Sequence, residues 1–373
     1  MPAVGMDISE TSLRFVQLMP QGDGFVLKKY GERAIPAGVI ADGDIKQADI
    51  FRDVLRRVKK DFGIRFVRAS LSETHSYIAE IEIPRVPLGE LRESLELQIG
   101  EHVPLPPEDI FFDYTIVDAD ADTNTNEAGG KKDRERAKRN SPNLRLIISA
   151  VSKAPVLKYV DVFSSAGLTL LSLEVDANAL VRAILSPGER ETALVIEVGR
   201  VKTGFYVVTN RSIRFVSEVD IGANSLGPPN TPVDVPIEST ASALAGEPDG
   251  AAGGENMENS ARKFSRSPEK ISAFFSQIKE ESEKHYIYWN SRHDRDPAHS
   301  EKIERIILAG SQSGLAGLAE YLSAVFREPV SRANPWTNVA SFRKYIPEIP
   351  REESLRYTTA IGLALHPYEK FLS

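Results

Sequence analysis

Residues 4–18 read VGMDISETSLRFVQL, and residues 194–208 read LVIEVGRVKTGFYVV. Each stretch is an apolar strand ending in an acid, then a polar turn with a small residue, then a second apolar strand. The matching residues keep a constant offset, 197 − 7 = 190, and are Asp7 with Glu197, Ser9 with Gly199 and Phe15 with Phe205. One long, fixed offset predicts two duplicated half-molecules rather than a short-period solenoid.

Apolar periodicity along the rest of the chain predicts an α/β protein. The expected strands are 25–35, 65–72, 77–84, 111–117, 144–151, 168–175 and 302–311. The expected helices cover about 48–62, 88–101, 155–166, 268–290 and 357–365, with one capped by Asp176 and one running from Leu315 to Phe326. Segments 118–143 and 228–262 lack apolar periodicity, which predicts a disordered loop and a low-complexity insertion.

Composition limits the possible functions. The chain has 373 residues, of which 41% are hydrophobic and 27% charged, and this is enough for two domains or more. The net charge of −7 gives no electrostatic reason to expect a nucleic-acid partner. Cysteine is absent, which excludes disulfides and thiolate chemistry. No signal peptide or membrane helix is expected, so any membrane role should go through a partner or a surface contact.

The two polar turns have the features of phosphate-binding turns. A tight turn between strands exposes backbone N–H groups that can hold an anion, and an acid before the turn can hold Mg²⁺ through water. A third motif, ILAGSQSGLAGL at 307–318, reads as a strand, a turn with two glycines and a helix that starts at once. The N-terminus of that helix could receive the phosphate or sugar of a nucleotide. The alternatives are two ordinary hairpins and a plain strand–helix connection.

These stretches together resemble the actin-like ATPase superfamily and, within it, the type IV pilus assembly protein PilM family, which is related to the division protein FtsA. The resemblance rests on the two repeat copies, on 307–318, on NPW at 334–336 and on the closing AIGLAL. The segment IGEHVPLPPEDIFFDY at 99–114 is similar to the helix-to-strand signature of that family's small inserted subdomain.

The resemblance implies a two-lobed actin-like fold, a duplicated ribonuclease H-like fold with a small inserted α+β subdomain. The first lobe is expected at 1–84, 152–190 and 350–373, the inserted subdomain at 85–151, and the second lobe at 191–349. The resemblance also implies that ATP and Mg²⁺ bind between the lobes. The implied cofactor-binding residues are Asp7, Ser9, Thr11 and Ser12 in the first loop, Glu197, Gly199, Lys202 and Thr203 in the second, and Gly310, Ser311 and Gly314 beside the adenosine. Of these, Asp7 and Glu197 would be the metal ligands.

The implied partner is the N-terminal cytoplasmic peptide of a PilN-like bitopic membrane protein, with pilus motor ATPases as possible further partners. The chain would then be cytoplasmic, held at the inner face of the membrane through that partner. The peptide groove is expected between the first lobe and the inserted subdomain, lined by Leu95, Ile99, Val103 and Leu105. Leu95 and Ile99 have an alternative role as core residues of the subdomain.

The sequence departs from the family pattern at the proposed phosphate loops. Ser9 replaces the usual glycine, and Glu10 adds a carboxylate that would repel a polyphosphate. Glu197 replaces the usual Asp, Arg200 follows the small residue, and no water-positioning base is evident. The sequence therefore favours an ATP-binding scaffold with weak or no ATPase activity. A pseudo-ATPase adaptor that binds only protein and a small-molecule kinase on the same fold remain alternatives.

Overall fold

The computed structural model describes residues 3–22, 24–117, 143–227, 268–295, 301–340 and 345–368. The loop predicted at 118–143, Asn143 apart, and the insertion predicted at 228–262 lie outside these residues. None of the helices in the described ranges combines the length and the apolar character needed to cross a membrane.

Two five-stranded sheets share one strand order, which confirms the predicted duplication. One sheet has the order β10-β6-β1-β2-β3 and the other has β15-β14-β11-β12-β13. The strands of the first are β1 Val4–Ile8, β2 Ser12–Gln21, β3 Gly24–Ala34, β6 Phe66–Leu71 and β10 Thr169–Val175. Those of the second are β11 Ala193–Val198, β12 Thr203–Thr209, β13 Ser212–Val219, β14 Arg305–Ala309 and β15 Val330–Arg332. In each copy the acid of the repeat lies on the central strand, β1 or β11.

The chain forms two compact units. Unit 1 comprises Met1–Asp7, Leu13–Glu32 and Ala177–Ser373, and unit 2 comprises Ile8–Ser12 and Arg33–Asp176. The predicted lobe boundaries stay a prediction.

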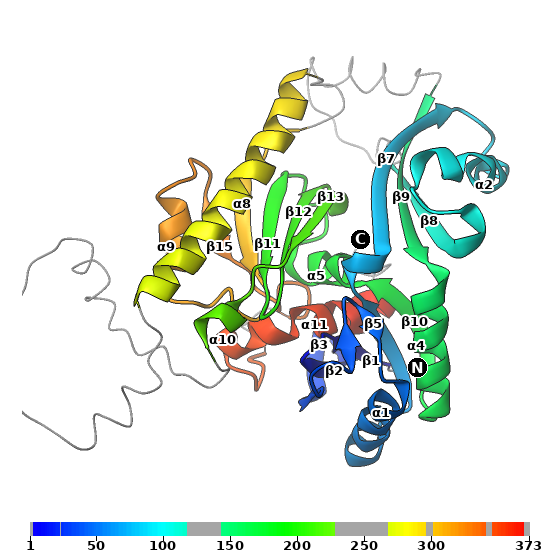
Figure 1. Ribbon diagram of the computed structural model, residues 1–373, viewed down its shortest axis with the longest axis vertical. Helices are drawn as coiled ribbons and strands as arrows, with labels where there is room; N and C mark the ends of the chain where they lie inside the picture. The colour runs from blue at the N-terminus through cyan, green and yellow to red at the C-terminus, as the bar shows by residue number, and fades with distance from the viewer. Residues whose placement is uncertain are drawn as a thin grey trace, which may run out of the picture. The chain divides into compact units, whose positions relative to one another are not determined.

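In unit 1, the long helix α8 (Pro268–Arg295) lies along the second sheet and closes its core (Figure 1). Its apolar stripe, spaced three or four residues apart as helical periodicity requires, buries Phe274, Phe275, Ile278 and Trp289. These side chains pack against Leu194, Ile196 and Phe205 of the sheet and against Leu318 and Leu322 of α9 (Leu318–Ser323).

Two further helices of unit 1, α5 (Asp176–Ile184) and α11 (Thr358–Leu365), meet at unusually short distance. A Cβ atom added to Gly362 would lie 1.7 Å from the backbone oxygen of Ala179. Asn338 supports the end of α5, since its Nδ2 donates to the carbonyl oxygens of Arg182 and Leu185, each at 2.7 Å. Only glycine at 362 permits this approach.

Unit 2 contains a small antiparallel sheet with the order β7-β9-β8, formed by Ser76–Pro84, Asn143–Ser152 and Ile110–Ile116. Alternate residues of these strands point to one face, where α2 (Leu91–His102) covers them. Helices α1 (Ala48–Phe62) and α4 (Lys153–Ser165) pack together through edge-to-face contacts of Phe51 with Tyr159 and Phe163. A two-residue turn joins the short strands β4 (Ile40–Ala41) and β5 (Asp44–Ile45).

The helix predicted from Leu315 to Phe326, directly after the turn with Gly310 and Gly314, is present but shorter, because α9 spans Leu318–Ser323. Residues 311–317 form turns, and α9 begins only at Leu318. Gly310 and Gly317 both adopt positive φ, +84° and +85°, a conformation that cannot continue into a helix. The amide of Gln312 instead donates to the carbonyl oxygen of Val198 at 2.9 Å. The helix N-terminus therefore lies at Gly317 and Leu318, eight residues or fewer after Gly310, and not beside Gly314 as the sequence predicts.

Smaller differences concern the ends of helices. Asp176 is the first residue of α5 and not its cap, and α4 begins at Lys153, two residues before Pro155. Leu88 precedes α2 and is 70% exposed. Helix ends depend on local hydrogen bonds, which periodicity does not report.

Candidate functional site

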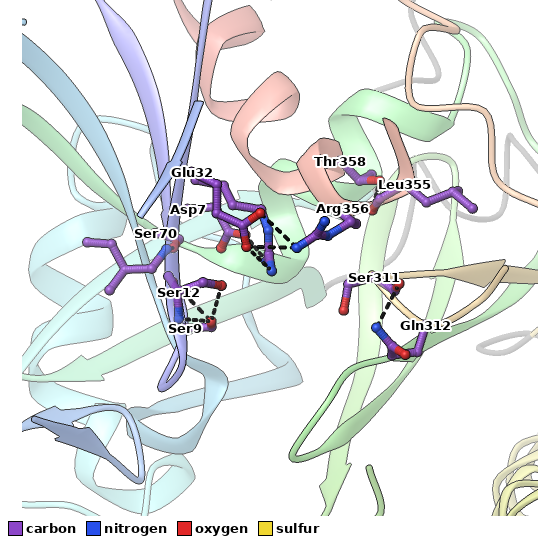
Figure 2. A network of polar contacts seen from close by, with 12 residues as sticks. Asp7, Ser9, Ser12, Glu32, Ser70, Ser311, Gln312, Leu355, Arg356 and Thr358 are labelled. Atoms are coloured by element: carbon purple, nitrogen blue, oxygen red, sulfur yellow. Dashed lines mark hydrogen bonds and ion pairs between the residues drawn. The ribbon is translucent and has the colours of Figure 1, made fainter. Parts of the chain in front are cut away.

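The first polar turn, 9–12, is closed by the side chain that replaces the usual glycine. The backbone amide of Ser9 donates to the carbonyl oxygen of Ser12 at 2.9 Å, and the Ser9 hydroxyl donates to the same oxygen at 3.0 Å. The amide of Ser12 in turn donates to the Ser9 hydroxyl at 3.2 Å. Figure 2 shows these bonds. Serine at position 9 therefore supports a tight turn between β1 and β2.

An ion network lies on the strands that flank this turn. Arg14 on β2 is almost completely buried and places Nη2 2.9 Å from Glu32 Oε1, while its Nη1 lies 3.9 Å from Asp7 Oδ2. Arg356 Nη2 contacts both oxygens of Glu32, at 2.9 and 2.7 Å (Figure 2). The predicted metal ligand Asp7 thus lies beside a buried cation.

Glu10, the acid expected to repel a polyphosphate, is engaged within unit 2. Its Oε1 accepts a hydrogen bond from the backbone amide of Asp42 at 2.9 Å. Asp42 has a positive φ of 52° in the turn between β4 and β5. The neighbouring Thr11 uses its carbonyl oxygen to accept from the amide of Ile35 at 3.0 Å. These two bonds connect the first turn to the 35–45 segment.

The second polar turn, 199–202, is tight, but two of its predicted ligands bond inside the protein. The amide of Gly199 donates to the carbonyl oxygen of Lys202 at 3.0 Å. Lys202 Nζ lies 2.8 Å from Glu218 Oε1, and the buried Thr203 hydroxyl donates to the carbonyl oxygen of Ile221 at 2.6 Å. An anion would have to compete for Lys202 and could not use the Thr203 hydroxyl without breaking its bond.

Glu197, the acid of the second copy, is positioned by a tyrosine. The hydroxyl of the buried Tyr206 donates to Glu197 Oε2 at 2.9 Å. Gly204 pairs with Glu197 across the strands and leaves room for the Tyr206 hydroxyl, since a Cβ at Gly204 would lie 2.2 Å from that oxygen. Gly310 lies on the other side, where a Cβ would be 2.8 Å from Glu197 Cγ. The structure thus brings Glu197 and Gly310 together, and their roles toward a nucleotide stay a prediction.

The rest of the third motif is less constrained. Ser311 is half-buried, and its carbonyl oxygen accepts from the side chain of Gln312 at 3.0 Å (Figure 2). The nearest atom to a Cβ at the exposed Gly314 would be Leu355 Cδ1 at 3.8 Å, an ordinary contact. Gly314 therefore has no steric need for glycine, and any role beside an adenosine stays a prediction.

The donor set fits a phosphate better at the first turn than at the second. Within the described ranges, the buried Nε of Arg14 has no hydrogen-bond partner, so this guanidinium has a donor to spare. No group of three or more histidine, aspartate or glutamate side chains suitable for a metal occurs in the same ranges. Asp7 and Glu197 would therefore have to hold Mg²⁺ mainly through water or phosphate oxygens, as is usual for this ion.

The residues predicted to line the peptide groove pack into the core of the small sheet. Leu95, Ile99 and Val103 are 0–2% exposed and belong to the cluster formed by α2 and the sheet, and Leu105 is partly buried against it. The burial of Leu95 and Ile99 agrees with their alternative role as core residues, and Val103 is buried beside them.

Four residues of these sites were not found from the sequence: Arg14, Glu32, Arg356 and Tyr206. One signal for Arg14 existed, because it is a single charge in an otherwise apolar, buried strand. Glu32 and Arg356 lie 324 positions apart and only the fold brings them together, whereas Tyr206 reaches Glu197 from the neighbouring strand, nine residues away.

Comparison with known proteins gives one family and several structures. A family described as type IV pilus assembly protein PilM matches residues 5–228. The structure of a PilM-PilN type IV pilus biogenesis complex is similar over 98% of this chain and 98% of the other, with 18% identity and a TM-score of 0.70. This likeness confirms the actin-like fold expected from the sequence.

Two other similar structures have lower scores. The ethanolamine utilization protein EutJ from Carboxydothermus hydrogenoformans is 14% identical, with 98% of this chain and 89% of that chain covered and a TM-score of 0.45. MreB5 of Spiroplasma citri bound to ADP is 11% identical, with 99% and 96% covered and a TM-score of 0.45.

Proposed function

This chain belongs to the type IV pilus assembly protein PilM family, and we propose that it acts as a cytoplasmic scaffold of a pilus inner-membrane platform. The observation that carries the proposal is the family match over residues 5–228, more than half of the 373 residues. We further propose that the scaffold binds the N-terminal cytoplasmic peptide of a PilN-like membrane protein. The likeness to a PilM-PilN complex over 98% of both chains supports this partner.

The surface that we propose for the peptide is an exposed apolar stripe on unit 2. It consists of Phe111 on β8 and of Leu157 and Val160 on α4, which are 44%, 57% and 45% exposed. Lys153, the first residue of α4, connects α4 to β8, because its Nζ lies 5.4 Å from the centre of the Phe111 ring. Leu157 follows one helical turn after Lys153 on the same face of α4. Exposed apolar side chains that gather on one surface are typical of binding sites.

Titration calorimetry with a synthetic peptide from the N-terminus of the cognate PilN-like protein tests this surface. Leu157→Asp should weaken binding at least tenfold, because it places a charge where the peptide buries apolar area. Leu171→Asp, a change at a 42% exposed leucine on β10, is the matched control and should leave binding unchanged. Equal binding by wild type and Leu157→Asp would contradict the placement, and absence of binding by wild type would contradict the partner.

The second part of the proposal is that Mg–ATP binds at the first polar turn. Arg14 supports it, since a buried guanidinium with a spare donor attracts phosphate oxygens strongly. Asp7 would hold Mg²⁺ through water, and Glu197 would face it from the second copy. Arg14→Ala should remove Mg–ATP binding measured by calorimetry, whereas Arg14→Lys should retain part of it. No binding by wild type at millimolar nucleotide would reject this part of the proposal.

One observation favours the alternative of an adaptor that binds only protein. Lys202 and Thr203, two predicted ligands of the second loop, bond to Glu218 and to the backbone of Ile221. The same calorimetric titration separates the two functions, because the adaptor binds the peptide but not the nucleotide.

A further inference from the structure

The ion network beside the first turn contains two acids and two bases from four separate segments. Asp7 lies on β1, Arg14 on β2, Glu32 on β3 and Arg356 in the 3₁₀ turn Leu355–Tyr357. Their side chains are 15%, 7%, 26% and 38% exposed, so the network runs from a buried cation to a partly exposed one. Its formal charge is zero when all four groups are ionised.

We propose that Glu32 competes with a bound polyphosphate for Arg14, and that Arg356 is the positioning residue that holds and neutralises Glu32. This pair would set the affinity of the nucleotide site, and the inference rests on the function proposed above. No step of catalysis is assigned to either residue.

Distances within the network give the reason for competition. Arg14 is 2.9 Å from Glu32 but 3.9 Å from Asp7, so its main partner is the acid on β3. A phosphate that approached the Arg14 guanidinium would meet the Glu32 carboxylate on the same cation. Two anions close to one another repel strongly where water is largely excluded. Glu32 therefore opposes the ligand that Arg14 attracts.

Arg356 reduces this opposition. Its Nη2 contacts both oxygens of Glu32, at 2.9 and 2.7 Å, so it binds the carboxylate more fully than Arg14 does. The segment that carries Arg356 is fixed, because the Thr358 hydroxyl donates to the carbonyl oxygen of Leu355 at 2.9 Å. Tyr357 packs edge-on against Tyr30, with ring centres 5.8 Å apart. Burial and then the nearby charge of Glu32 raise the pKa of Tyr357, so its neutral ring adds no further anion.

Opposite charge changes should therefore have opposite effects on anion binding. Glu32→Gln removes the competing anion and leaves Arg14 free for phosphate, so affinity should rise about tenfold, equivalent to about 1.4 kcal/mol. Arg356→Gln removes one cation from Glu32, so the carboxylate draws more strongly on Arg14 and the affinity should fall about tenfold. The double variant should lie close to Glu32→Gln, because Arg356 acts only through Glu32, and this non-additivity identifies the coupling. A merely structural role would weaken binding in both single variants.

The experiment is calorimetry of the full chain with Mg–ATP and, separately, with inorganic tripolyphosphate. Thermal unfolding verifies that each variant is folded. Arg33→Gln breaks the exposed ion pair of Arg33 with Asp61, 3.0 Å apart, and as the matched control should leave both affinities within about twofold of wild type.

The outcomes separate the two proposals. Tighter binding by Glu32→Gln together with weaker binding by Arg356→Gln supports the inference. Binding by wild type that neither variant alters, or that both weaken, overturns the inference and leaves the nucleotide proposal standing. If wild type binds neither Mg–ATP nor tripolyphosphate, the inference requires that Glu32→Gln bind tripolyphosphate. If Glu32→Gln does not bind it either, the inference and the nucleotide proposal are both overturned.

Discussion

Replacing Gly362 with alanine tests whether the position of α11 depends on close backbone packing. An added Cβ would lie 1.7 Å from the carbonyl oxygen of Ala179 and 2.5 Å from its carbonyl carbon, both on α5. Normal carbon–oxygen contacts begin near about 3.3 Å. The two helices would therefore have to separate by about 1.6 Å to accept one methyl group.

The size of the effect follows from how firmly α11 is held. All eight residues of α11 are buried, and a Cβ at Gly5 of β1 would lie 2.1 Å from the carbonyl oxygen of Ala360. A helix with two such contacts cannot shift freely, so overpacking should cost about 3 kcal/mol, the upper part of the usual range. Alanine regains about 1 kcal/mol of helix propensity. We expect a net loss of about 2 kcal/mol in the free energy of unfolding.

Circular dichroism during urea and thermal unfolding measures this loss. For a chain of 373 residues, about 2 kcal/mol corresponds to a decrease in Tm of about 3 °C. The matched control is Gly100→Ala in α2, also a helical glycine but exposed, where the nearest atom to the new Cβ is Pro107 Cγ at 3.3 Å. The exposed Pro107 ring has to yield by only a few tenths of an ångström, so that variant should lose less than about 1 kcal/mol. If Gly362→Ala equals wild type or exceeds it, the reasoning from close packing is wrong.

Two further predictions concern the cores. Leu95→Ala should lower the free energy of unfolding by about 2–5 kcal/mol, because the Leu95 side chain is fully buried. Its control is Leu97→Ala on the same helix, where the side chain is 87% exposed and the change should be less than about 0.5 kcal/mol. Equal losses for the two variants in urea unfolding would contradict this prediction. Burial lowers the pKa of His285, which lies between Phe205 and Phe215 with Glu281 and Lys284 nearby, below its ordinary 6.5. The His285 imidazole therefore binds a proton less readily in the folded chain than in the unfolded chain, so the free energy of unfolding should fall as the pH decreases below about 6.5. Unfolding curves measured from pH 7.5 to 5 should show a smaller fall for His285→Phe than for wild type.

The sequence contained enough information for the fold, because strands and helices leave periodic patterns. The alternation at 77–84 predicted β7, and the spacing from Phe51 to Phe62 predicted α1. The repeat offset predicted duplicated half-molecules, and the two sheets have the same strand order. The helix expected from Leu315 begins three residues later, because the positive φ of Gly317, rather than side-chain periodicity, decides where it can start.

The candidate site was less predictable, because its chemistry depends on contacts between distant residues. Glu32 and Arg356 are 324 positions apart in the chain, and no local pattern relates them. The predicted loop residues illustrate the same limit, since Lys202 and Thr203 are at the expected positions but bond to other parts of the protein. Residue type and spacing can predict where a turn occurs, whereas the partner of each side chain depends on the folded neighbours.

The two copies of the repeat share a strand order but differ in charge. Arg14 corresponds by offset to Gly204, since 204 − 14 = 190, so the second copy has no cation where the first has one. There Glu197 meets the neutral hydroxyl of Tyr206, and the nearby Lys202 pairs with an acid on β13. The anion site proposed above therefore rests on a cation that the second copy does not have at the equivalent position. It follows that the nucleotide proposal depends on Arg14, while the peptide proposal, which rests on unit 2, can hold without it.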